Sequence, residues 1–238
     1  MKIFMALCGI ATLIGACHVG FNSVKGSGNI ITQNRAVEDF TIVNASGPMD
    51  VEITMGNNYK VDVEADDNLM SYIIIKKKGD ELVIKLKDDV NFKIDHPVTV
   101  RIQTPKLREV IATGSGNIKT IGQVNSNDKI ETSLAGSGNI TMEVNAPEIE
   151  SSIAGSGNTN ISGQTRLVDI SIAGSGNFNA ADLKSEKANV SIAGSGDVKI
   201  FASVNLDVSI VGSGDVIYSG TPNISKSVIG SGSIKSQQ

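Results

Sequence analysis

The triplet Gly-Ser-Gly recurs seven times between residues 114 and 232, at spacings of 18 to 22 residues. Three of the seven stand in the identical phrase Ser-Ile-Ala-Gly-Ser-Gly, and the others stand in close variants of it. A near-constant period of this size is typical of repeat proteins, in which each unit buries its apolar face only by stacking on its neighbours. The sequence therefore predicts a stack of similar units. An eighth triplet, at residues 26–28, lies upstream and out of phase.

Apolar and polar residues alternate on both sides of each triplet. Around Gly174, for example, Ile170 and Ile172 precede the glycine and Phe178 follows it, with polar residues between them. A period of two is the pattern of a half-buried β-strand, so each unit is predicted to be a strand, a corner at the triplet and a second strand. The predicted fold class is all-β: a parallel β-helix, or β-solenoid, with about 18–22 residues per coil, preceded by a strand-rich part that contains a hairpin.

The glycines of the triplets are predicted to be structural. Corners of neighbouring coils must superimpose, and glycine adopts backbone angles that other residues avoid and lets adjacent turns approach closely. The predicted corner glycines are Gly114, Gly116, Gly136, Gly138, Gly155, Gly157, Gly174, Gly176, Gly194, Gly196, Gly212, Gly214, Gly230 and Gly232.

Four segments are predicted along the chain: 1–17 a signal peptide, 18–39 a polar tether, 40–106 an N-terminal β region, and 107–238 the Gly-Ser-Gly repeat β-helix. In the third segment, Lys78-Gly79-Asp80 separates two apolar runs and predicts the turn of a hairpin. The pairs Asp66-Asp67 and Asp88-Asp89 fall at predicted connections between strands, so we interpret them as solvated turn residues.

The N-terminus has the features of an export signal. Lys2 precedes an apolar run over residues 3–14 that is too short to span a membrane and is typical of a secretory signal peptide. The segment ends Ile-Gly-Ala-Cys, which resembles the lipobox of bacterial lipoproteins and makes Cys17 the predicted lipidation site. Simple secretion and an incidental cysteine are the alternatives. Cys8 and Cys17 are the only cysteines of the sequence, so the mature chain is expected to hold no internal disulfide.

The composition limits the core and the partners. Aromatic residues make up 4% of the chain and tryptophan is absent, so the core must be thin and built from small aliphatic side chains. The net charge is -4 and no long basic run occurs. A nucleic-acid partner would require a basic stripe that neutralises phosphates, so we expect no nucleic-acid binding.

The order of several sequence blocks resembles one bacterial family. The tract GSGNIITQNRAVEDFTIVNASGPMDVEI, then VDVEADDNL, then ELVIKL, then the train of GSGN and GSGD units is similar to the family described as "putative auto-transporter adhesin, head GIN domain". The resemblance covers nearly all of the chain after the signal. It implies an exported β-helical protein of the cell envelope, and it supplies no catalytic residues to carry over.

One polar column lies three residues after the first glycine of each triplet: Asn117, Asn139, Asn158, Asn177, Asp197, Asp215 and Ser233. One interpretation is a ladder of stacked amides that satisfies the corner backbone, which we favour. The other is a ligand site for calcium or sugar hydroxyls. Calcium prefers six or more oxygen ligands and this column holds two carboxylates, so no metal site and no cofactor is predicted.

Catalytic residues are not predicted. A nucleophilic serine requires a base within hydrogen-bond reach, and the two histidines, His18 and His96, do not recur with the serines of the triplets. A glycosidase would place carboxylates from different elements across a cleft, whereas the aspartate pairs are sequential.

Three functions are compatible with this pattern. The leading one is a non-enzymatic, adhesin-like or structural protein of the bacterial envelope, anchored to the outer membrane or cell surface through Cys17, whose extended polar face binds a glycan or a protein. The alternatives are a carbohydrate-active enzyme on a β-helix scaffold and a self-assembling scaffold that stacks through an uncovered coil at either end. The ligand, the binding face and the oligomeric state are left open.

Overall fold

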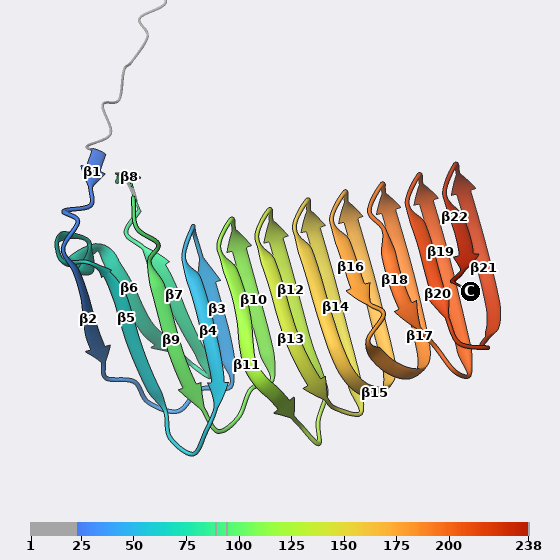
Figure 1. Cartoon of the computed structure of the whole chain (residues 1–238), viewed down its shortest axis with the longest axis horizontal. Helices are drawn as coiled ribbons and strands as arrows, with labels where there is room; N and C mark the ends of the chain where they lie inside the picture. The colour runs from blue at the N-terminus through green and yellow to red at the C-terminus, as the bar shows by residue number, and fades with distance from the viewer. Residues whose placement is uncertain (1–22, 89, 94, 238) are drawn as a thin grey trace, which may run out of the picture.

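The computed structural model of the protein describes residues 23–237 except 89 and 94, and it confirms the predicted all-β solenoid. Flat coils stack side by side along one long axis (Figure 1). Twenty strands belong to one hydrogen-bonded system, while β1 (Ser23–Lys25) and β8 (Asn91–Lys93) form a small separate pair. The signal segment, Cys17 and His18 lie outside the described residues. No helix in the described part of the chain is long and apolar enough to cross a membrane.

Each repeat coil contributes one strand to each of two facing sheets. Sheet 1 consists of β10 (Glu109–Gly114), β12 (Ile130–Gly136), β14 (Glu148–Gly155), the second half of β15 (Asn158–Gly174), β17 (Leu183–Gly194), β19 (Asn205–Gly212) and β21 (Asn223–Gly230). Sheet 2 consists of β11 (Asn117–Asn125), β13 (Asn139–Asn145), the first half of β15, β16 (Asn177–Ala180), β18 (Val198–Phe201), β20 (Asp215–Ser219) and β22 (Ser233–Ser236).

The glycine triplets form the arch that joins sheet 1 to sheet 2. The first glycines of successive triplets pair in register, as Gly136 does with Gly155, and each has a positive φ, +130° at Gly136. A Cβ on Gly136 would overlap the carbonyl oxygen of Gly114 in the preceding coil. The backbone N–H of Ser137 donates to that same carbonyl over 2.8 Å, so the hydrogen-bond ladder continues around the arch.

The core is a single apolar column set between the two sheets. Alternate residues of each strand point inward, so Ile149 and Ile153 of β14 are buried while Glu150 and Ser152 face solvent. Two of the buried polar side chains satisfy each other, because Thr132 Oγ1 donates to Ser151 Oγ over 2.8 Å. The thin lumen follows from the scarcity of aromatic residues, since in-register strands stack side chains of similar size.

The stack of coils begins upstream of the predicted boundary at Leu107. Strands β3 (Ile42–Ser46) and β4 (Asp50–Met55) pair in parallel with β10 and β11, and β7 (Glu81–Leu86) and β9 (Thr99–Thr104) pair in parallel with β3 and β4. The coil formed by β7 and β9 follows β3 and β4 in the sequence, but it stacks on their N-terminal side, away from β10 and β11. The turn at residues 46–48 replaces the glycine triplet, which is why the period misses this coil.

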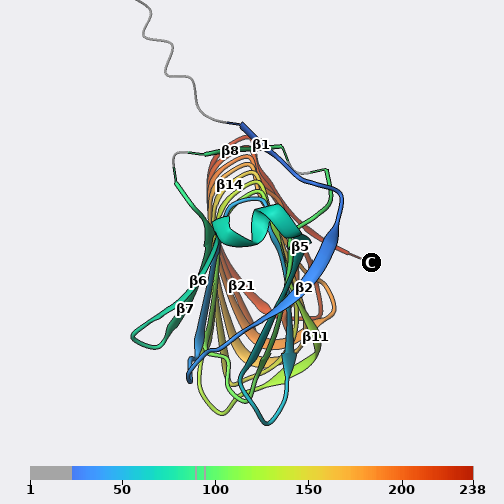
Figure 2. The same ribbon diagram turned by 90° about the vertical axis from the view of Figure 1, so that its left-hand side faces the viewer.

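Antiparallel strands cover the N-terminal end of the rod. The hairpin partner β6 (Ile73–Lys78) pairs with β7, while β5 (Lys60–Asp66) pairs with β9 and β2 (Ile30–Arg35) pairs with β5. The 3-10 helix η1 (Asp67–Tyr72) lies across this end and buries Leu69 and Met70 (Figure 2). The hypothesis that both ends expose an uncovered coil is therefore wrong for the N-terminal end. At the other end, β19 is the one strand of the described chain that pairs with β21.

The described part of the predicted polar tether is ordered into β1 and β2, which revises that interpretation. Its upstream triplet forms a loop over the start of η1, where the Gly28 N–H donates to Asp66 Oδ1 over 2.6 Å and Asn29 Nδ2 donates to Asp67 Oδ2 over 2.9 Å. Asp66 is fully buried, so its interpretation as a solvated turn residue is wrong. The loop supplies one hydrogen bond to Asp66 Oδ1, whereas the other buried oxygen, Oδ2, has no hydrogen-bond partner among the described residues.

Candidate functional site: a groove along sheet 1

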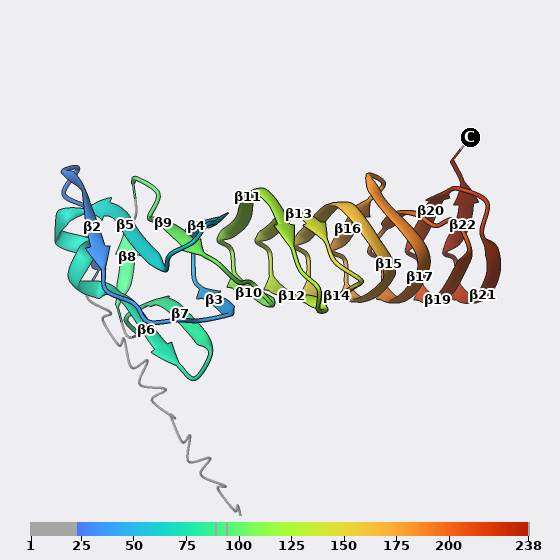
Figure 3. The same ribbon diagram turned by 90° about the horizontal axis from the view of Figure 1, so that it is seen from below.

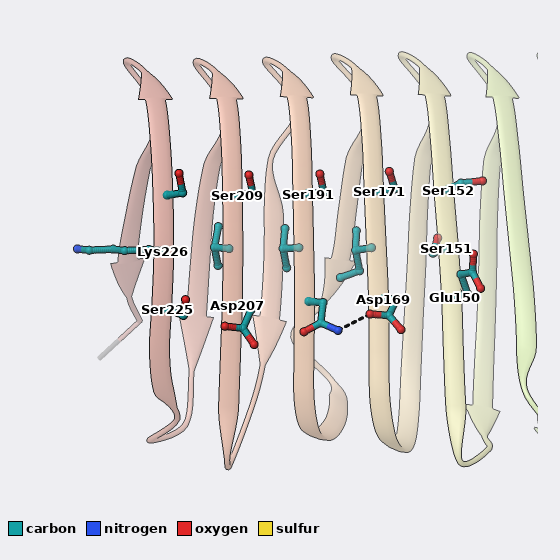
Figure 4. A pocket seen from close by; sticks show the side chains of 15 residues that line it. Glu150, Ser151, Ser152, Asp169, Ser171, Ser191, Asp207, Ser209, Ser225 and Lys226 are labelled. Carbon is teal, nitrogen blue, oxygen red and sulfur yellow. Dashed lines mark hydrogen bonds between the residues drawn. The ribbon is translucent and has the colours of Figure 1, made fainter.

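A groove of about 540 Å³ runs along the outer surface of sheet 1, across β14, β15, β17, β19 and β21 (Figure 4). Two rows of outward side chains border it. The acidic row consists of Glu150, Asp169, Asn189, Asp207 and Ser225, and the serine row consists of Ser152, Ser171, Ser191, Ser209 and Ser227. The two rows alternate with inward residues along each strand, as the pleat requires.

The rows are straight because the strands pair in register. Glu150 pairs with Asp169 and Ser152 with Ser171, and the same pairing repeats from strand to strand up to β21. Neighbouring members of a row are therefore about 4.8 Å apart, the spacing of hydrogen-bonded strands. Each strand that crosses the groove therefore contributes one residue of the acidic row and one serine hydroxyl.

The floor of the groove is the backbone between the two rows. Ile170, Val190 and Val208 occupy the positions between them, and their side chains point into the core with at most 4% of their surface exposed. Serine side chains are short, so nothing large fills the space above the floor. The last floor position is Lys226, which extends past the end of the rod (Figure 4).

Negative charge concentrates in the acidic row. Lys129 contacts Glu150 over 2.7 Å and Glu131 over 3.1 Å, and these hydrogen bonds raise the pKa of Lys129 above its usual range. Asp169 accepts a hydrogen bond from Asn189. Among the described residues, Asp169 and Asp207 take part in no ion pair. Two carboxylates inside the groove are thus available to a ligand.

The row continues upstream with more carboxylates. Glu109 pairs with Glu131, and Glu131 pairs with Glu150, so like charges lie opposite one another on neighbouring strands. Burial, followed by repulsion from Glu131, raises the pKa of Glu109. Lys129 bridges Glu131 and Glu150, so the electrostatic penalty of stacked carboxylates falls on Glu109.

The asparagine column on sheet 2 is a chain of side-chain hydrogen bonds. Asn117 Nδ2 donates to Asp50 Oδ1 over 2.8 Å, and Asn139, Asn158 and Asn177 each donate to the preceding member over 2.7, 3.0 and 2.9 Å. Further along, the backbone N–H groups of Asp197, Asp215 and Ser233 donate to the preceding side chain. Each asparagine of the column uses its amide oxygen and one of its two amide N–H groups within the ladder, so the side chains are held in place by one another.

One member of that ladder was missed by sequence reasoning. Asp50 starts the ladder, which ends at Ser233 of the predicted column. The signal was present for Asp50, which stands three residues after Gly47 as Asn117 stands three after Gly114. Sequence reasoning also missed the serine row, although its members open the repeated phrase Ser-Ile-Ala-Gly-Ser-Gly.

The other residues considered for chemistry do not converge. His96 lies on the N-terminal cap, where its Nδ1 is 3.6 Å from Asp66 Oδ1, and the serines of the triplets lie on the arches of the coils. In the part of the chain that the structure describes, no group of three or more histidine, cysteine, aspartate or glutamate side chains could hold a metal ion.

Comparison with known proteins identifies the class. The family model described as "Putative auto-transporter adhesin, head GIN domain" matches residues 39–222, so the chain belongs to this family of adhesin-like β-solenoids. A comparison with curated proteins finds no match.

Solved structures share the fold over nearly the whole chain. A putative adhesin from Bacteroides fragilis is 22% identical, with a TM-score of 0.86 over 90% of this chain and 100% of that one. A protein from Parabacteroides distasonis described as a putative lipid binding protein is 27% identical, with a TM-score of 0.77 over 91% of this chain and 100% of that one. A putative adhesin from Parabacteroides merdae is 25% identical, with a TM-score of 0.70 over the same shares.

Proposed function

We propose that this protein is a non-enzymatic, adhesin-like binding protein of the bacterial cell envelope, and that its groove on sheet 1 holds an extended glycan that is neutral or bears amino groups. The observation that carries the proposal is the pairing of an acidic row with a serine row along one straight groove. Carboxylates accept hydrogen bonds from sugar hydroxyls and attract ammonium groups, while they repel carboxylate or sulfate groups.

The layout of the carboxylates supports binding over hydrolysis. A glycosidase places two carboxyl groups on opposite sides of the scissile bond, roughly 5 to 9.5 Å apart. In this groove, Glu150, Asp169 and Asp207 all lie in one row, and serines face them from the other side. A polymer lying in the groove would contact acceptors along one edge only.

Repetition gives such a site its affinity. A single hydroxyl–carboxylate contact in water contributes little, but a polymer that engages several rungs at once makes every further contact intramolecular. The ligand that fits is itself repetitive and extended. This argument favours a glycan chain over a small molecule.

The anchor belongs to the same proposal. Lipidation at Cys17 would attach the protein to the outer membrane or cell surface at its N-terminal end. The groove crosses β14 to β21, toward the opposite end of the rod (Figure 1). The coils nearest the anchor would then act as a spacer.

Titration calorimetry with defined oligosaccharides tests the binding site. A chitosan pentamer, which carries free amino groups, should bind more tightly than its N-acetylated counterpart. Asp169→Asn and Asp207→Asn should each weaken chitosan binding about tenfold, the loss expected for one charge-assisted hydrogen bond. Asp128→Asn removes the same charge from an exposed turn outside the groove and should have no effect. Absence of binding by both oligomers, or equal losses in all three variants, would refute the glycan site.

Cell fractionation with surface proteolysis tests the location separately. Wild-type protein should enter the membrane fraction and be cleaved by protease added to intact cells, and Cys17→Ala should be released. Full protection of the wild-type chain would exclude an adhesive role outside the cell.

A further inference from the structure

A second groove, of about 560 Å³, lies on the edge of the rod opposite the glycine arches. Here the connections from sheet 2 back to sheet 1 pass from one coil to the next, and Figure 3 views the rod from this side. We call it the edge groove and define it by Asn145, Gln164, Arg166, Lys184, Glu186 and Phe201, which are among its lining residues. The connections differ in length between coils, so this edge is uneven where the arches are uniform.

Three polar side chains lie in register along the edge groove. Asn145 pairs with Gln164 on the next strand, and Gln164 pairs with Lys184 on the one after. The Asn145 amide donates to Asn125 Oδ1 over 3.1 Å, which fixes its orientation. Along the groove, the amides of Asn145 and Gln164, which can both donate and accept, and the ammonium group of Lys184 therefore lie at successive steps of about 4.8 Å.

The ammonium group is positioned by an aromatic ring. Lys184 Nζ lies 4.4 Å from the centroid of the Phe201 ring, a cation–π contact. Phe201 is partly exposed, whereas Phe178 on the neighbouring strand β16 is buried in the core. The groove therefore has an apolar ring at its surface beside a held cation.

The floor beneath these groups is fixed by buried hydroxyls. Thr165 Oγ1 donates to the Leu167 carbonyl over 2.9 Å, and Ser185 Oγ donates to the Phe201 carbonyl. Both Thr165 and Ser185 are more than nine-tenths buried. Binding would thus require little reorganisation of the backbone, which favours affinity.

The charge of the edge groove is opposite to that of the groove on sheet 1. It contains Arg166 and Lys184 against a single carboxylate, Glu186. Within the described residues neither cation is engaged in an ion pair. Two cations without a carboxylate partner attract anions, and the guanidinium group matches a carboxylate or sulfate in bidentate fashion.

From these contacts we infer that the edge groove is a second binding site, specific for an acidic saccharide. Arg166 and Lys184 bind its acidic substituents, Asn145 and Gln164 exchange hydrogen bonds with its hydroxyls, and the Phe201 ring packs against a sugar face. Pockets that combine an apolar surface with a few fixed polar groups are the usual form of small-ligand sites. This inference does not depend on the proposed groove on sheet 1, because the two sites share no residue and differ in charge.

The test is titration of the mature chain with a galacturonic acid tetramer and with a neutral galactose tetramer. The acidic oligomer should bind at least tenfold more tightly, and its affinity should fall as salt is raised because exposed charges are screened. Arg166→Gln, Lys184→Gln and Phe201→Leu should each weaken binding of the acidic oligomer five- to tenfold. All three side chains are wholly or partly exposed, so melting temperatures should stay near wild type.

Two controls make the result decisive. Lys199→Gln removes a lysine from an exposed position of sheet 2 outside the edge groove, and it should leave the affinity within twofold. Asp169→Asn, in the groove on sheet 1, should not weaken binding of the acidic oligomer. Equal affinity for the two tetramers, no binding of either, or an equal loss in Lys199→Gln would overturn the inference. None of these outcomes bears on chitosan binding by the sheet 1 groove.

Discussion

Glycine meets two requirements at the arches, a positive φ and the close approach of neighbouring coils, and three substitutions separate them. Gly79, in the turn of the β6–β7 hairpin, serves as the reference: it has φ +62° and nothing within 4 Å of where a Cβ would stand, so Gly79→Ala changes only the backbone preference. At Gly176 φ lies outside the left-handed region, but a Cβ would overlap the Gly157 carbonyl oxygen, so Gly176→Ala tests close approach alone. Gly174 combines φ +129° with overlap of the Gly155 carbonyl oxygen.

The expected losses of unfolding free energy rank accordingly. Gly79→Ala should cost about 1 kcal/mol, the penalty for a left-handed residue with a Cβ. Gly176→Ala should cost about 2 kcal/mol, because overpacking against backbone forces neighbouring coils apart. Gly174→Ala should cost about 4 kcal/mol, because strain and overlap add at one site. For a chain of this size that corresponds to a fall in Tm of roughly 10 °C.

Urea melts followed by far-ultraviolet circular dichroism, repeated with a second spectroscopic probe, measure these differences. The two probes should coincide if the coils unfold together, a condition that repeat proteins do not always meet. Equal losses for Gly79→Ala and Gly174→Ala would refute the reasoning, since close approach would then contribute nothing. An unchanged unfolding free energy in Gly176→Ala would likewise show that close approach contributes nothing.

Three further predictions concern other parts of the rod. Asn158→Ala removes two ladder bonds, to Asn139 and from Asn177, and should lower the unfolding free energy by about 1 to 2 kcal/mol in a urea melt; an unchanged midpoint would show that the ladder is not stabilising. Because folding raises the pKa of Glu109, the stability that this group contributes is present at low pH and is lost as the pH rises through the raised pKa. Glu109→Gln should therefore increase Tm at pH 7 and have no such effect near pH 3. Equal shifts of Tm at both pH values would contradict this. Lys226→Val removes the charge from the uncovered last coil and should produce concentration-dependent association in sedimentation velocity, whereas a monomer at all concentrations would show that the lysine does not protect this edge.

The coils could be predicted from sequence because their rules are local. A period of two fixes which residues face the core, and the triplet fixes the register, so Ile153 and Ile172 could be placed in one column from the sequence alone. The glycine period also located each arch.

The N-terminal cap could not be predicted, because its pairing is non-local. Strand β9 joins the stack beside β4, which lies far from it in the sequence, and no periodic signal encodes that choice. The burial of Asp66 has the same origin, since its carboxylate is covered by the Gly28 loop, 38 residues upstream. Long-range contacts of this kind depend on loop closure and packing, which local patterns do not report.

The edge groove escaped prediction for a related reason. Its residues lie on β13, β15, β17 and β18, and Lys184 pairs with Gln164, so Arg166 and Lys184 share no column position that a repeat alignment would bring together. The structure places them in one groove because β15 and β17 bend around the same edge of the rod.

Closure of one end has an evolutionary consequence for the length of the rod. Each coil contacts only the coils next to it, so a duplicated unit of 18 to 22 residues can enter between β14 and β21 without disturbing the N-terminal cap. Every such insertion would lengthen the groove on sheet 1 by about 4.8 Å and add one more position to each of its two rows. Ligand reach in this architecture can therefore change by whole steps through gene duplication, while the fold of every existing coil stays the same.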